Sequence, residues 1–209
     1  MSPVERLLER GLLELGLENQ PVAPLMKLMA QLKKWNQFIN LSAIENDEEM
    51  AVKHILDSLS VHPHIQGAHR LLDVGTGGGF PGLPLAMAFP DMYWTLIDSS
   101  AKKIDFVRQA CMALNIRSVQ AIHTRVQDYL ANAPFDVIIS RAMTSVEQLV
   151  RLSSHLCHPD GRIMAMKGCF PAQELEGISL MHEVHPLHVP FLEGSRHIVI
   201  VEGVGLWPK

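Results

Sequence analysis

The stretch from Leu72 to Ala86, LDVGTGGGFPGLPLA, constrains the fold of this chain more than any other feature. The apolar residues around 71–74 predict a buried strand, and the chain then turns sharply through GTGGG at 75–79. Pro81 follows at a position where a helix can begin, because a residue in the first turn of a helix needs no N–H donor. A strand, a glycine turn and a helix start together present backbone N–H groups and the positive end of a helix dipole to a ligand. This arrangement predicts a site for a nucleotide-type cofactor.

Two overlapping glycine patterns point to different cofactors. The dinucleotide fingerprint G-x-G-x-x-G would use Gly77, Gly79 and Gly82. The pattern D-x-G-x-G-x-G, typical of S-adenosylmethionine (SAM) sites, would use Asp73 with the glycines at 75, 77 and 79. The dinucleotide pattern starts two residues late, and the bulky Phe80 fills space that a pyrophosphate would need. The SAM pattern therefore fits better, and a nicotinamide-dependent oxidoreductase is the alternative.

The next strand supports a bound adenosine. The β-rich run at 92–97 ends in Asp98, which lies 23 residues beyond Gly75. At the carboxyl end of a second strand, an acidic side chain can accept hydrogen bonds from both ribose hydroxyls. The structural alternative is that Asp98 and Ser99 cap a helix beginning near Ala101. Both roles are compatible, because Ser99 or Ser100 would suffice for capping.

Short motifs along nearly the whole chain resemble the RsmG family, also called glucose-inhibited division protein B, of bacterial small-subunit ribosomal RNA methyltransferases. Besides the glycine loop, the matching stretches are KWN at 34–36, NLSAI at 40–44, HILDSL at 54–59, LIDSSAKKIDFV at 96–107, SRA at 140–142, MKG at 166–168 and RHIVIV at 196–201. The resemblance implies a SAM-dependent enzyme that methylates N7 of a guanosine in 16S ribosomal RNA. Its partner would be that RNA or the small ribosomal subunit.

The motifs and the resemblance together select a set of cofactor-binding residues. They are Gly75, Gly77, Phe80, Asp98, Val126, Gln127 and Arg141. Many relatives carry an acidic residue where Gln127 stands here, and the neighbouring Asp128 is a possible substitute. Arg141 follows the fourth strand, where the resemblance implies that it helps to bind SAM. The structural alternative for Arg141 is an ion pair with Asp136 or Glu147.

The fold class expected is α/β: a Rossmann-like class I SAM-dependent methyltransferase with a mostly parallel seven-stranded sheet and helices on both faces. Strands are predicted near 70–75, 92–98, 118–123, 135–140, 161–167, 183–190 and 196–202. A Pro-Asp-Gly turn at 159–161 is expected before the fifth strand. Apolar residues at helical spacing predict an N-terminal helical extension over 1–65, followed by the SAM-binding domain over 66–209.

The composition of the chain bears on its location, its metal and disulfide content and its binding of RNA. The chain has no apolar run long enough to span a membrane and no apolar signal core, so a cytoplasmic protein is expected. It is also expected to be a monomer. Its three cysteines, at 111, 157 and 169, suggest neither a disulfide framework nor a zinc site. Its histidines lack ligand-spaced partners, so no metal is expected. The net charge of −4 argues against a general polyelectrolyte binder. However, five basic and two acidic residues over 98–125 predict a local basic face.

The chemistry explains why no catalytic base stands out. N7 of guanine has an in-plane lone pair and no proton to lose, so methyl transfer to it requires alignment rather than a general base. His54 and Asp57, three residues apart, could contact RNA, although a helix-surface hydrogen bond is the commoner explanation. Trp35 and Phe38 are predicted to be core residues rather than base-stacking ones. A non-catalytic ribosome-assembly factor on the same fold is the remaining alternative.

Overall fold

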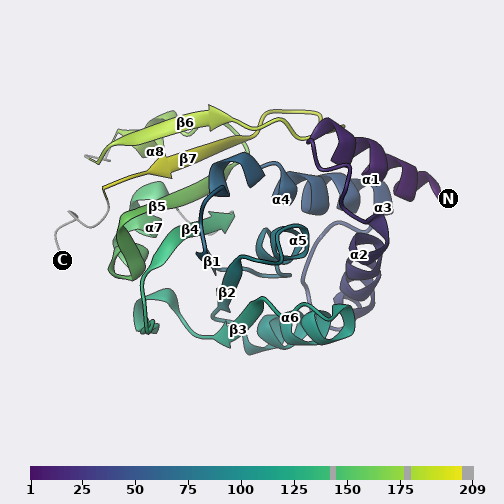
Figure 1. The fold of residues 1–209 in the computed structure, drawn as a ribbon, viewed down its shortest axis with the longest axis horizontal. Coiled ribbons are helices and arrows are strands. Elements are labelled where there is room, and N and C mark those ends of the chain that lie inside the picture. The colour runs from purple at the N-terminus through teal and green to yellow at the C-terminus, as the bar shows by residue number, and fades with distance from the viewer. Residues whose placement is uncertain (142–144, 177–179, 204–209) are drawn as a thin grey trace.

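A seven-stranded sheet forms the centre of the computed structural model, which describes residues 1–141, 145–176 and 180–203. The strand order is β3-β2-β1-β4-β5-β7-β6 (Figure 1). The first five strands pair in parallel, and β7 runs antiparallel to both β5 and β6. The expected mostly parallel sheet is therefore confirmed. Ala142, the last residue of the SRA motif, lies outside the described residues.

The strands lie close to their predicted positions. Their bounds are β1 Arg70–Val74, β2 Tyr93–Asp98, β3 Val119–His123, β4 Phe135–Arg141, β5 Cys157–Lys167, β6 His182–Pro186 and β7 His197–Val201. The turn predicted before the fifth strand is wrong, because residues 159–161 lie inside β5, where its pairing with β4 shifts register. A Cβ at Gly161 would lie 2.9 Å from the backbone oxygens of Phe135 and Asp136. Glycine here permits a close approach of two strands.

Helical segments fill both the first third of the chain and the connections between strands. The α-helices are α1 Pro3–Glu14, α2 Val22–Asn36, α3 Asp47–Met50, α4 Asp57–Leu59, α5 Gly82–Ala88, α6 Ala101–Leu114, α7 Val146–Ser153 and α8 Ala172–Leu175. A π-helix, η1 Ala51–Leu56, joins α3 to α4, and short 3₁₀ turns are η2 His62–Ile65, η3 Val126–Asp128 and η4 Ser154–Leu156. Ser2 and Glu5 form a capping box that fixes the start of α1.

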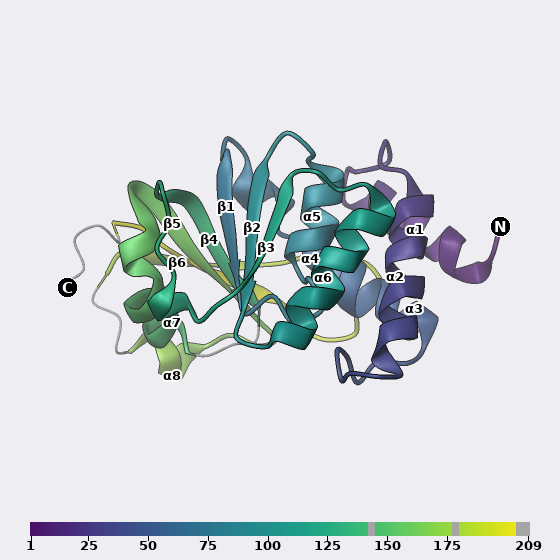
Figure 2. The ribbon, with the colours of Figure 1, turned by 90° about the horizontal axis from the view of Figure 1, so that it is seen from below.

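Alternate residues of each central strand face opposite sides of the sheet. Leu71, Leu96 and Ile139 belong to a core that also contains residues of the N-terminal helices. Leu72 and Ile138 belong to a second core, which includes the apolar face of α7. In Figure 2, α5 and α6 cover one face with α1 and α2 outside them, and α7 lies on the other face. This three-layer packing explains the near-continuous apolar character of the parallel strands.

The two aromatic residues predicted for the core have different environments. Trp35 packs edge-on against Phe106 of α6, with ring centroids 5.9 Å apart. Phe38 is 78% exposed, so its assignment to the core is wrong. The helix ends at Asn36, and the apolar stripe of α2 therefore does not extend to Phe38.

Candidate functional site

A cavity of about 670 Å³ opens at the carboxyl edge of the parallel strands. It lies where the strand order reverses between β1 and β4, which is the place where open α/β sheets bind ligands. The residues predicted from sequence as cofactor-binding are brought together here. Those in the cavity wall are Gly75, Gly77, Phe80, Asp98, Val126, Gln127 and Arg141. Residues spread over 67 positions of the sequence therefore line one continuous cavity.

The side chain of Asp73 holds the glycine loop in place through two hydrogen bonds. Its Oδ2 accepts hydrogen bonds from the Thr76 hydroxyl at 2.7 Å and from the Gly82 N–H at 3.0 Å. The side chain is fully buried, and this burial raises its pKa to about 6 although both hydrogen bonds and the charge of Arg141 oppose the shift. Its position at the end of β1 ties the start of α5 to the strand, so the loop between them has a fixed shape.

The loop itself is bonded to the end of β2. The N–H groups of Gly75 and Thr76 both donate to the carbonyl oxygen of Ile97, and the Gly77 N–H donates to Asp98 Oδ2 at 2.9 Å. The expectation that these loop N–H groups are free for a ligand is therefore wrong at Gly75 and Gly77. Both glycines have left-handed φ values, +70° and +58°. They keep side chains out of the cavity, so the loop backbone still lies directly against it.

Asp98 is buried, with only 8% of its surface exposed, and its carboxylate accepts two hydrogen bonds. Oδ2 accepts from Gly77, and Oδ1 accepts from the Ser100 N–H at 2.8 Å. Ser100 is the N-cap of α6, but its side chain makes no capping hydrogen bond. The predicted capping by that serine is thus not observed, and Asp98 binds its N–H instead. Each carboxylate oxygen retains a further lone pair for a donor in the cavity.

The connection after β3 forms another part of the cavity wall. Val126 is buried and Gln127 is exposed to the cavity, both within the single turn η3. Gln127 lines the cavity, whereas Asp128 is absent from the described residues that line it. Asp128 therefore does not substitute for the acidic residue that many relatives carry at position 127. Lys103 and Arg125 also reach the cavity wall, and both belong to the locally basic stretch of the sequence.

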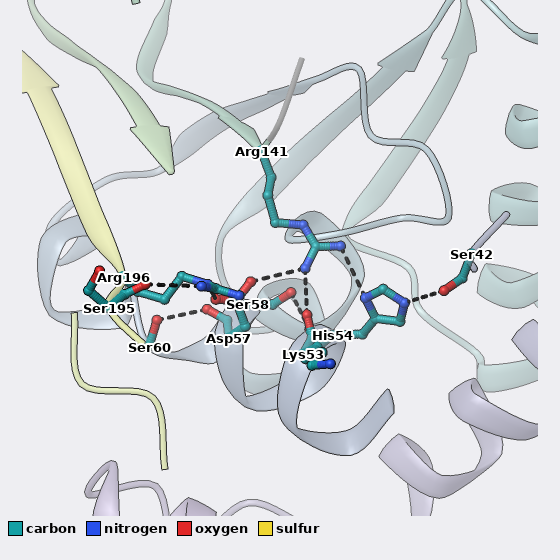
Figure 3. Close-up of polar contacts among 9 residues, drawn as sticks. All are labelled: Ser42, Lys53, His54, Asp57, Ser58, Ser60, Arg141, Ser195 and Arg196. Atoms are coloured by element: carbon teal, nitrogen blue, oxygen red, sulfur yellow. Dashed lines mark hydrogen bonds and ion pairs between the residues drawn. The ribbon is translucent and has the colours of Figure 1, made fainter. Parts of the chain in front are cut away.

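Arg141, the last residue of β4, is held by the N-terminal helices (Figure 3). Nη1 donates to the Lys53 carbonyl oxygen at 2.9 Å and forms an ion pair with Asp57 Oδ2 at 3.1 Å. The carboxylate paired with Arg141 is thus Asp57 rather than the predicted Asp136 or Glu147, and Asp136 accepts from the N–H groups of residues 69 and 70 at the start of β1. The guanidinium also lies 5.3 Å from the centroid of the Phe80 ring, within cation–π range.

Sequence reasoning did not assign His54 to the site, although its motif HILDSL was part of the resemblance. The imidazole stacks on Phe80, and its Nδ1 lies 3.4 Å from Arg141 Nη2. A guanidinium can only donate, so Nδ1 is the acceptor and Nε2–H donates to Ser42 Oγ at 2.7 Å. Burial, followed by the charge of Arg141, lowers the pKa of His54 to about 4. The ring is therefore neutral at pH 7.

Other constellations named from sequence make no comparable site. Within the described ranges, no group of three or more His, Cys, Asp or Glu side chains is arranged to hold a metal ion. None of the helices in the part of the chain that the structure covers is long and apolar enough to cross a membrane.

Two solved structures with a similar architecture are an O-methyltransferase and a putative O-methyltransferase. The O-methyltransferase TomG from Streptomyces achromogenes superposes with a TM-score of 0.60 at 16% identity, over 97% of this chain and 100% of TomG. A putative O-methyltransferase from Klebsiella pneumoniae gives a TM-score of 0.58 at 12% identity, over 84% of this chain and 90% of that one. These similarities establish the fold, and they confirm the predicted Rossmann-like class I methyltransferase architecture.

Relatives found by sequence comparison have a much higher identity to this chain than these solved structures have. A ribosomal RNA small subunit methyltransferase G from Chromobacterium violaceum is 44% identical, over 92% of this chain and 94% of its own length. A protein of the same name from Legionella pneumophila subsp. pneumophila is 43% identical, over 96% of this chain and 95% of its own. The family model for rRNA small subunit methyltransferase G (GidB) matches residues 22–199. The family predicted from the sequence motifs is thus confirmed, and this chain belongs to the rRNA small subunit methyltransferase G family.

Proposed function

We propose that this protein transfers a methyl group from SAM to N7 of a guanosine in 16S ribosomal RNA. The observation that carries this proposal is the meeting of the glycine loop, Asp98, the η3 turn and Arg141 around one cavity, in a chain of this family. Family membership favours a methyltransferase over both alternatives, the nicotinamide-dependent oxidoreductase and the non-catalytic assembly factor. The helices of 1–65 and the domain over 66–209 act as one unit, since Arg141 is bonded to Lys53 and Asp57.

The residues around the cavity fit the chemistry of SAM. Asp98 is the acceptor for the ribose hydroxyls through its remaining lone pairs. Val126 and Gln127 hold the adenine between an apolar surface and a side-chain amide. Gly75 and Gly77 leave room beside the loop, where a Cβ at Gly77 would meet no atom closer than the Gly75 oxygen at 4.0 Å. Phe80 and Arg141 close the remaining side, where His54 also lies.

The main task of these residues in the reaction is to align SAM with the guanine base. When bound, SAM supplies a methyl group already activated by its sulfonium charge. Transfer to guanine N7 would form an N–C bond as the S–C bond of SAM breaks, with S-adenosylhomocysteine as the leaving group, and N7 would lose no proton. No general base is needed, because N7 of guanine carries no proton that must be removed. The role left to the chain is to orient two ligands and to exclude water between them.

The basic residues in the cavity wall suit an RNA substrate. Lys103 and Arg125 lie in the wall beside the proposed adenosine site, where they can contact phosphates of an approaching strand. A ribosomal RNA substrate supports a cytoplasmic location for the protein. We further propose that it acts as a monomer, which size-exclusion chromatography with light scattering measures directly.

Calorimetric titration and methyl-transfer assays test the proposal. Purified protein is titrated with SAM and, separately, with NAD; saturable binding of SAM alone is expected, and binding of NAD alone would support the oxidoreductase. Radiolabelled transfer is then measured to 16S RNA and to small subunits from cells lacking the protein. Borohydride and aniline treatment cleaves the RNA at 7-methylguanosine and locates the product. SAM binding without transfer to either substrate would favour the assembly factor.

A further inference from the structure

Asp57 is a buried carboxylate placed between two arginines that are distant in sequence. Its side chain is 4% exposed, and each of its oxygens binds one guanidinium. Oδ2 lies 3.1 Å from Arg141 Nη1, and Oδ1 lies 3.0 Å from Arg196 Nε. Figure 3 shows the carboxylate between the two side chains. Arg141 ends β4 and Arg196 directly precedes β7, so one acidic residue links two strands to the N-terminal helices.

The carboxylate acts on the cavity only through Arg141. The described cavity wall includes Arg141 and His54 but not Asp57. Arg141 is fixed from several directions: by Asp57, by the Lys53 carbonyl oxygen, by His54 Nδ1 and by the face of Phe80. Asp57 supplies the only carboxylate among these contacts. The others are neutral, so they orient the guanidinium without balancing its charge.

The π-helix brings these groups into one place. Residues 51–56 form η1, and Asp57 begins α4 directly after it. This segment supplies Lys53, His54 and Asp57, all of which contact Arg141. A single π-helical turn inside a helix is a feature often found at functional sites. Here it aims a carbonyl oxygen, an imidazole and a carboxylate at the same guanidinium.

Loss of the carboxylate would leave two guanidinium groups facing each other with no negative charge between them. Like charges in a partly buried position repel strongly, because the surrounding protein screens them less than water does. Arg141 is 20% exposed at its side chain, and it can relieve the repulsion by moving toward the open cavity. Its guanidinium would then leave the position above Phe80.

We infer that Asp57 is a positioning residue, which holds Arg141 in the orientation that the SAM site requires. The inference rests on the proposed function, because it assumes that the cavity binds SAM. It assigns a role in cofactor binding to a residue that does not touch the cofactor site. It also gives the N-terminal helices a direct part in forming that site.

A double-mutant cycle tests the inference. The dissociation constant for SAM is measured for wild type, Asp57→Asn, Arg141→Gln and the double variant, by calorimetry. Asp57→Asn is expected to weaken SAM binding about tenfold, the effect of losing one charge-assisted contact. In the Arg141→Gln background the same change is expected to have almost no further effect, because Asp57 acts through Arg141. A purely structural role would instead give equal, additive losses in both backgrounds, and this result would overturn the inference.

Two further variants keep the test decisive. Asp57→Glu retains the charge and is expected to recover part of the lost affinity; the cycle is repeated with it if Asp57→Asn does not fold. Asp136→Asn is the control, because Asp136 is a carboxylate that binds backbone N–H groups at the opposite edge of the sheet. Its SAM affinity should match wild type. If wild type itself binds no SAM, the proposed function fails and the inference fails with it. If wild type binds and folded Asp57→Asn binds equally well, only the inference fails.

Discussion

His54 and Phe80 stack face to face, with ring centroids 4.7 Å apart and ring planes inclined by 17°. His54 belongs to the π-helix of the N-terminal region, and Phe80 follows the glycine loop. The stack therefore joins the helical extension to the loop that shapes the cavity. It also shields one face of the imidazole from water, which favours the neutral form of the ring.

The lowered pKa of His54 predicts a specific loss of stability in acid. Its pKa falls from 6.5 in the unfolded chain to about 4 in the folded one. The unfolded state thus binds the proton more tightly, so the contribution of His54 is complete above pH 6.5 and is lost as the pH falls toward 4. Thermal unfolding of wild type and His54→Gln is measured between pH 4 and 8. The stability advantage of wild type should be constant above pH 6.5 and should shrink as the pH falls from 6.5 to 4. A constant difference would contradict the prediction.

Asp73 should show the opposite dependence. Its pKa rises from 3.8 when unfolded to about 6 when folded, so the folded state binds the proton more tightly. The stability of wild type relative to Asp73→Asn should therefore decrease as the pH rises from 4 to 6, and level off above that. The asparagine oxygen can still accept from Thr76 or Gly82, which keeps the loop close to its native shape. Melting curves of both proteins over this range measure the difference, and a slope of the other sign refutes the assignment.

Asp98 is expected to contribute strongly to SAM affinity. Asp98→Ala should weaken binding by about 10- to 100-fold, the effect of losing a charge-assisted hydrogen bond. Asp105→Ala is a suitable control, since Asp105 lies on α6 with its side chain 59% exposed and pairs only with Arg108 among the ion pairs of the described chain. Calorimetry on both variants gives the comparison. An unchanged dissociation constant for Asp98→Ala would remove this residue from the site.

Gly77 and Gly16 form a matched pair for separating backbone strain from ligand contact. Both have left-handed φ values, +58° and +70°. An added Cβ would meet nothing within 4 Å at Gly16 and only the Gly75 oxygen, at 4.0 Å, at Gly77. Alanine at either position should destabilise the fold by about 1–2 kcal/mol through backbone strain. Only Gly77→Ala is expected to weaken SAM binding, since Gly77 lines the cavity. Equal SAM affinities of the two variants would show that the loop backbone does not approach the cofactor.

Gly82 illustrates a different constraint, which is packing. A Cβ there would lie 2.8 Å from Leu96 Cγ and 2.9 Å from Asp73 Oδ2, both of them buried. Gly82→Ala should destabilise the protein by about 1–3 kcal/mol, although alanine is the better helix former. For a domain of this size, the melting temperature should fall by about 2–4 °C per kcal/mol. A melting temperature equal to that of wild type would mean that the strand and helix separate easily.

The sequence alone predicted the sheet and the edge of it where the predicted cofactor-binding residues line one cavity. Strands alternating with helical segments predict a mostly parallel sheet, and parallel strands place their carboxyl ends at one edge. Gly75, Asp98, Val126 and Arg141 each follow or end a strand, so the strand pattern places them at this edge, while the family resemblance implies the roles of Val126 and Arg141. The fifth strand was predicted less well, since its Pro-Asp-Gly segment is absorbed into a bulge against β4.

Only the tertiary structure decided which groups hold the site in place. The hydrogen-bond partners of Arg141 come from residues more than 80 positions earlier, and no local periodicity specifies such contacts. The same holds for the loop N–H groups, which bond to the end of β2 rather than staying free. Propensity and spacing act over a few residues, whereas these hydrogen bonds exist only once separate layers have packed. That is the physical reason why the sequence located the cavity but not the contacts that fix its shape.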